Sequence, residues 1–144
     1  MEYHSKYGTE IILRVHRRDI ERARIEPAMN FASRTAPNKA QFDRWLAKGA
    51  VRVWLYESKV DGGRGAIVGC FDCPSIARAT AWRARGPRLS DGAYFVGKDF
   101  CLWRVRDLKL FSGAQPRERF GLACPPDSWV RVRCRAEGGS DAEV

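Results

Sequence analysis

The sequence predicts a small α+β fold: a mixed β-barrel of five or six strands with two or three short helices packed around it. One observation behind this prediction is that several runs alternate apolar and polar residues and are rich in β-branched side chains, as half-buried strands are. Another is that the run from Phe100 to Phe111 changes its alternation partway. A bulge or bend near Asp107 would restore a continuous apolar face, as happens where a sheet curls into a barrel.

The N-terminal third predicts one strand and two helices. Glu10–His16 alternates like a strand, and Arg17–Ile25 has the apolar spacing of a short, charged helix. Residues 26–37 are irregular and contain prolines at both ends. The clearest helix runs from Asn38 to Gly49, because Asn38 can accept an unpaired backbone N–H and Gly49 can take the left-handed conformation that ends a helix.

The rest of the chain predicts mainly strands. Val51–Ser58 and Ala66–Cys73 flank the turn sequence D-G-G-R-G and therefore predict a hairpin. Residues 74–82 predict a short helix that starts at a proline, and residues 83–92 predict a basic loop. Trp129–Arg135 predicts the last strand, which Pro125 and Pro126 would lead into.

Length and composition indicate one cytoplasmic domain. A chain of 144 residues suits a single domain, here residues 1–135, followed by a flexible acidic tail over 136–144. No apolar run is long enough to span a bilayer, and the N-terminus lacks the apolar block of a secretory signal. Five cysteines cannot form a complete disulfide framework, which favours a reducing compartment. We expect no membrane partner, and a monomer is favoured.

The net charge favours a polyanionic partner. The whole chain carries a formal charge of +9, and the last nine residues contain three carboxylates and no base, so residues 1–135 carry +12. A small domain with that excess should attract nucleic acid first. The alternative is a solvated basic face without a specific partner.

Aromatic and arginine side chains share faces of two predicted strands. Trp54 and Tyr56 alternate on one face of their strand, and Trp129 shares a face of the last strand with Arg131 and Arg133. Rings stack on unpaired bases while guanidinium groups hold phosphates, which is the usual arrangement for binding single strands. The alternative is that the tryptophans pack in the core beneath arginine stems.

Other patterns with possible chemistry are weak. Cys70 and Cys73 have metal-type spacing, but no second pair and no nearby histidine completes four ligands. Gly62–Gly65 has no following Lys-Ser or Lys-Thr and is better explained as a turn. Ser128 follows two prolines, and no neighbouring residue could act as its base. A serine hydroxyl in such a turn commonly bonds to nearby backbone, so Ser128 is not predicted to be a nucleophile. We expect no metal and no cofactor.

The order of motifs from residue 51 to 135 resembles the ASCH domain, a branch of the PUA-like superfamily. The matching elements, in order, are Tyr56–Ser58 at the end of one strand, Val68–Phe71 in the strand that corresponds to the family's V-x-G-x-F, Tyr94–Lys98 as Y-F-x-G-K, and Phe120–Trp129, which contains the P-P-x-S-[aromatic] element. The resemblance implies a PUA-like barrel. It adds Ser58 and Lys98 to the candidate binding residues.

The N-terminal part departs from the family's G-x-K-x-x-E-x-R motif, whose side chains line the ligand cleft. In one register Lys39 and Arg44 keep the Lys-to-Arg spacing and Phe42 replaces the acid. In another, Asn30 lies near the acidic position and Arg34 near the arginine. Either way the carboxylate is lost or moved, and both registers stay open.

Three functions are consistent with these observations. The resemblance and the charge together favour a protein that binds RNA, another single-stranded nucleic acid or a modified nucleoside in a basic cleft. Because some relatives hydrolyse N4-acetylcytidine and at least one is a ribonuclease, the first alternative is a small hydrolase, with Lys39 or Thr35 as its catalytic candidates. A lysine base would require burial that depresses its pKa. The second alternative is a protein-interaction or coregulator module.

Overall fold

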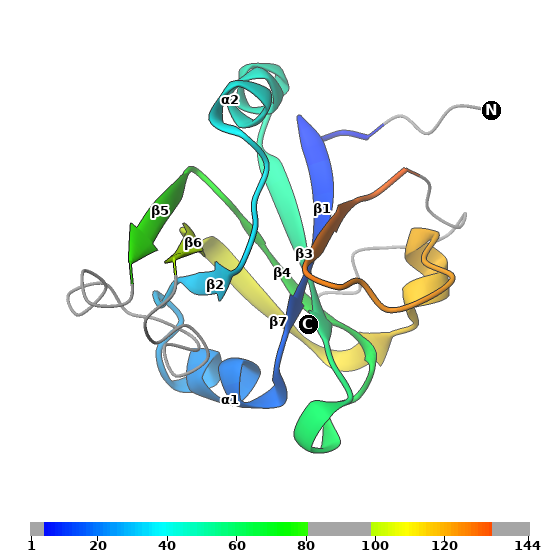
Figure 1. The fold of residues 1–144 in the computed structure, drawn as a ribbon. Coiled ribbons are helices and arrows are strands. Elements are labelled where there is room, and N and C mark those ends of the chain that lie inside the picture. Colours follow the sequence, from blue (N-terminus) through cyan, green and yellow to red (C-terminus); the bar gives the residue numbers. More distant parts are fainter. Residues whose placement is uncertain (1–4, 81–98, 134–144) are drawn as a thin grey trace.

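The computed structural model describes residues 5–80 and 99–133, which form an α+β fold with eight strands in two sheets and two α-helices (Figure 1). The five-stranded sheet has the order β7-β4-β3-β1-β8, and the three-stranded sheet has the order β2-β6-β5. The strands are β1 (Thr9–Val15), β2 (Phe31–Ser33), β3 (Val51–Glu57), β4 (Ala66–Asp72), β5 (Ile76–Thr80), β6 (Asp99–Trp103), β7 (Arg106–Gln115) and β8 (Trp129–Arg131), the helices are α1 (Arg17–Ile25) and α2 (Lys39–Lys48), and the short 3-10 turns are η1 (Val60–Gly62) and η4 (Arg117–Phe120).

The larger sheet has an apolar cluster on each face. On one face, Leu13 and Val53 pack against Phe42 of α2, together with residues of α1, β2 and β6. On the other face, Trp54 packs against Phe111 of β7 and Phe120 of η4, whose ring centroids lie 6.3 and 5.1 Å from the indole. The central strands are therefore buried on both sides, and all seven residues of β3 are buried.

Most of the sequence predictions for individual elements are confirmed. Helix α1 has the predicted bounds. Helix α2 begins after Asn38, whose side-chain oxygen accepts the backbone N–H of Gln41 at 2.8 Å. Strands β3 and β4 form the predicted antiparallel hairpin. The predicted irregularity is present, because Asp107 has a φ of 56° and the β4–β7 register shifts beside it.

Four details differ from the predictions. The predicted helix over residues 74–82 is wrong, because Ile76–Thr80 is the strand β5, which pairs with β6. The run from Phe100 to Phe111 is divided between β6 and β7 instead of forming one strand. The end of α2 is not left-handed, because Gly49 has φ 157° and ψ −175° while its N–H still bonds helix carbonyls. The strand count of eight also exceeds the predicted five or six.

The β5 error has a physical cause. The partner of β5 is β6, with Thr80 opposite Asp99, so the pairing joins segments that are distant in sequence. A short run that can be helix or strand takes the strand form when a partner strand satisfies its backbone groups.

Some predictions concern residues that the structure does not describe. These are the loop over 83–92, Lys98, residues 134–135 and the tail over 136–144. No helix in the described part has the length and apolar content needed to cross a bilayer.

Candidate ligand pocket beside helix α2

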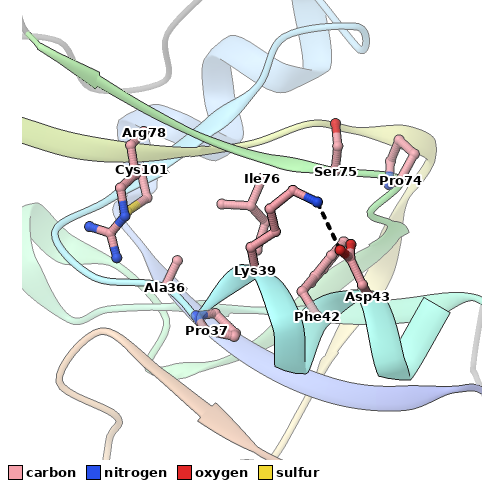
Figure 2. A pocket seen from close by; sticks show the side chains of 10 residues that line it. All are labelled: Ala36, Pro37, Lys39, Phe42, Asp43, Pro74, Ser75, Ile76, Arg78 and Cys101. Carbon is pink, nitrogen blue, oxygen red and sulfur yellow. Dashed lines mark hydrogen bonds and ion pairs between the residues drawn. The ribbon is translucent and has the colours of Figure 1, made fainter.

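A pocket of about 350 Å³ opens between the first turns of α2 and the strands β5 and β6 (Figure 2). Its lining comes from three segments that are separate in sequence: Ala36, Pro37, Lys39, Phe42 and Asp43; Pro74, Ser75, Ile76 and Arg78; and Cys101. The size is at the lower end of the range for small-molecule sites.

The local sequence explains how α2 contributes to this pocket. Asn38 caps the helix, so the first turn begins at Lys39. Residues four apart lie on one side of a helix, which places Lys39 and Asp43 together at the pocket edge. Phe42 turns toward the core and is 5% exposed, so one side of it forms an apolar wall. The helix therefore presents one apolar and two charged side chains to the same space.

The opposite wall comes from the strands β5 and β6. Ile76 supplies apolar surface, and Arg78, two residues later on β5, lies beside Cys101 of β6 (Figure 2). The chain before β5 is held by two bonds to the Ser75 carbonyl, one donated by the backbone N–H of Arg104 at 3.1 Å and one by the Cys73 thiol at 3.2 Å. Arg78 is therefore a cation on a strand that is paired with β6 and held at its start.

Two of the charged side chains at the pocket edge, Lys39 and Asp43, form an ion pair. The Lys39 ammonium donates to an Asp43 carboxylate oxygen at 2.8 Å (Figure 2). This hydrogen bond and the negative charge of Asp43 raise the pKa of Lys39, so the ammonium stays protonated at neutral pH. Burial raises the pKa of the Cys101 thiol, and the nearby charge of Arg78 opposes that shift. The pocket thus combines two cations, one carboxylate, a neutral thiol and apolar walls.

Of the predicted site residues that the structure describes, only Lys39 lines this pocket. Arg34 and Thr35 are exposed in the segment between β2 and α2, and the Thr35 hydroxyl donates to the Ser128 hydroxyl at 3.4 Å. Arg44 is exposed on α2 but does not line the pocket. Lys39 and Arg44 therefore do not converge on one cavity.

Trp54 and Tyr56 are not surface rings. They are 0% and 1% exposed and belong to the apolar cluster on the second face of the large sheet. The indole N–H of Trp54 donates to the Glu10 carboxylate at 3.1 Å. The prediction that these rings stack on bases is wrong for this conformation, because neither has an open face.

Ser58 is also buried, at 3% exposed. Its hydroxyl lies 3.0 Å from Nδ1 of His16, and its backbone N–H bonds to the Val15 carbonyl. The contact ties the end of β3 to the chain that leads from β1 into α1. Ser58 lies outside the pocket lining.

The last strand places Trp129 and Arg131 on the other flank of α2. Trp129 is half-buried and contacts Trp103 edge-on, with 6.4 Å between ring centroids. Arg131 is exposed, and its guanidinium lies 5.5 Å from the Trp45 ring centroid. Both side chains point to the same face of the sheet, as their alternation predicted, but they are not in the pocket.

Sequence reasoning missed Arg78, Asp43 and Cys101. Asp43 could have been found, because it follows Lys39 by four residues on a predicted helix. Arg78 could not, because its segment was assigned to a helix. Cys101 lies inside the run from Phe100 to Phe111, where a cysteine in an alternating strand pattern indicates a small apolar residue and not a pocket wall.

Comparison with known proteins identifies the fold. No family model matches the chain, and no curated protein matches it. Among solved structures, the ASCH protein from Zymomonas mobilis is similar, with a TM-score of 0.59 and 13% identity over 88% of this chain and 89% of that one. A Tyr-to-Phe variant of the same protein gives a TM-score of 0.60 and 12% identity, covering 87% and 91%. The chain therefore has the fold of the Zymomonas mobilis ASCH protein.

Proposed function

We propose that this protein is an RNA-binding member of the ASCH family and that the pocket beside α2 accepts one nucleotide of a single-stranded RNA or a modified nucleotide. The ordered motifs from residue 51 onward and the shared fold support the family. The observation that carries the binding proposal is the pairing of an apolar space of about 350 Å³ with Lys39 and Arg78 at its edge. These two cations come from separate elements, α2 and β5.

The chemistry of the pocket fits a nucleotide. A base presents an apolar face that packs against Phe42 and Ile76, while phosphate oxygens accept hydrogen bonds from a guanidinium or an ammonium. The Arg78 fork is suited to phosphate because it can donate two parallel hydrogen bonds. The excess of basic residues outside the tail would draw a polyanion toward this surface.

A hydrolase that uses Lys39 as its base is disfavoured. A lysine base requires a depressed pKa, which burial or a neighbouring cation can produce. Lys39 is instead solvated, paired with Asp43, and has a raised pKa. The Thr35 hydroxyl bonds only to the Ser128 hydroxyl among the described residues, so no base activates it there.

The test is binding of a fluorescent single-stranded RNA oligomer over a salt series. Arg78→Gln should weaken binding about tenfold, which corresponds to about 1.4 kcal/mol and to one charge-assisted contact. The salt dependence should also decrease, because one fewer counterion is released. Arg24→Gln is the matched control, since this arginine is exposed on α1 and lies outside the pocket.

Two outcomes would contradict the proposal. One is wild-type binding that is weak and insensitive to salt. The other is an equal loss of affinity in Arg78→Gln and Arg24→Gln, which would indicate general charge attraction instead of a pocket.

A further inference from the structure

Arg131 is an exposed cation that the structure holds in one orientation. Its Nε donates to the Thr9 hydroxyl at 2.9 Å, and its guanidinium lies over the Trp45 ring at 5.5 Å from the centroid. Thr9 and Trp45 are themselves buried, at 3% and 5% exposed. The guanidinium is therefore fixed by rigid neighbours on two sides.

The outer end of this guanidinium is available to a ligand. The terminal nitrogens of Arg131 make no hydrogen bond to any of the described residues, and no carboxylate among them pairs with it. An arginine that serves only to cover the Trp45 ring would not need the bond to Thr9. An arginine whose Nε is held in place and whose two terminal nitrogens still have N–H groups to donate is preorganised for an anion, because little side-chain entropy remains to be lost on binding.

The surroundings of Arg131 add positive charge. Arg133 follows it by two residues and is also exposed. On α2, Lys48 lies on the Trp45 side of the helix because the two are three residues apart. Lys39 lies roughly 120° around the helix from Trp45 at 100° per residue, so the pocket and Arg131 are on different flanks of α2.

We infer that Arg131 is a second phosphate contact for the RNA whose nucleotide occupies the pocket, so that the strand crosses α2 and the protein selects an RNA strand over a free nucleotide. This inference rests on the proposed function. A helix with its side chains is about 10–12 Å across, and stacked nucleotides advance about 3.4 Å each. About three or more nucleotides are then needed to reach both sites, and a mononucleotide cannot contact Arg131 while it occupies the pocket.

The experiment compares ligands of different length with matched variants. A labelled random-sequence hexaribonucleotide is titrated by fluorescence anisotropy, and an equal mixture of the four ribonucleoside monophosphates is titrated by NMR. Arg131→Gln should weaken hexamer binding roughly tenfold. It should lower the salt slope by about 0.7, the single-strand value for one phosphate. It should leave mononucleotide binding unchanged.

Two further variants test the fixed orientation. Arg131→Lys keeps the charge but loses the fork and the bond to Thr9, so it should recover only part of the hexamer affinity. Thr9→Val removes the acceptor hydroxyl with little change of shape and should give a smaller loss than Arg131→Gln. Melting temperatures close to wild type show that the variants are folded.

The outcomes separate the inference from the proposed function. If wild type binds mononucleotides but Arg131→Gln leaves hexamer affinity unchanged, or weakens both ligands equally, the inference is overturned. Full recovery of affinity in Arg131→Lys would overturn the fixed orientation. If wild type binds neither ligand, the proposed function itself fails.

Discussion

Replacing Ser33 by alanine should destabilise the protein and loosen the segment that borders the pocket. The Ser33 hydroxyl accepts the indole N–H of Trp103 at 2.6 Å and donates to the Thr35 carbonyl at 2.6 Å. Ser33 is 5% exposed and Trp103 is 0% exposed, so water does not readily replace either bond. The substitution leaves a buried indole N–H without a partner and frees Thr35 near the start of the pocket lining.

The expected magnitude follows from these two bonds. A buried donor left without a partner costs about 1–3 kcal/mol, and the lost bond to Thr35 costs about 0.5–1.5 kcal/mol. Ser33→Ala should therefore lower the free energy of unfolding by about 1.5–4.5 kcal/mol. Urea denaturation monitored by circular dichroism measures this change in the free energy of unfolding. The m-value should stay unchanged, because the surface area exposed on unfolding is similar in wild type and variant.

A double-mutant cycle separates the free-energy cost of the unsatisfied Trp103 indole N–H from the other effects of Ser33→Ala. Trp103→Phe removes the indole N–H together with part of the ring, so its own cost includes a cavity. In that background Ser33→Ala should cost about 1–2 kcal/mol less than in wild type, because no donor is left unsatisfied. The reasoning is refuted if the serine substitution costs the same in both backgrounds, or if it costs almost nothing in wild type.

Three further predictions concern packing and charge. Gly63→Ala should lower the urea midpoint clearly, because an added Cβ would lie 1.7 Å from the Ser58 carbonyl oxygen. Gly113→Ala is the control and should change the midpoint little, because its added Cβ would have no atom within 4 Å. Equal midpoints for the two variants would contradict this prediction. Burial raises the pKa of the Cys73 thiol from 9.0 to about 12, so its contribution to stability is complete below about pH 9 and is lost as the pH rises toward 12. The free energy of unfolding of wild type should fall more steeply above pH 9 than that of Cys73→Ala, and parallel curves would argue against it. Lys39→Gln should leave the melting temperature unchanged because its ion pair is solvated, and a clear fall would show that the pair is structural.

Elements whose signals are local could be predicted from the sequence. The bounds of α1, the Asn38 cap of α2 and the hairpin around the D-G-G-R-G turn all follow from spacing and side chains within a few residues. The irregularity at Asp107 was visible as a change of alternation in one run. The resemblance in ordered motifs predicted the α+β fold that the structural comparison supports.

Which surfaces are exposed and where a pocket forms could not be predicted in this way, because both depend on contacts between distant segments. Alternation shows that Trp54 and Tyr56 share a face of β3, but not that Phe111 and Phe120, more than fifty residues later, cover that face. The pocket joins α2 to a strand whose backbone pairing with β6 overrides its local preference. The physical reason is the same in both cases: an isolated strand has two equivalent faces and two open edges, and only contacts with distant segments determine which of them meet water.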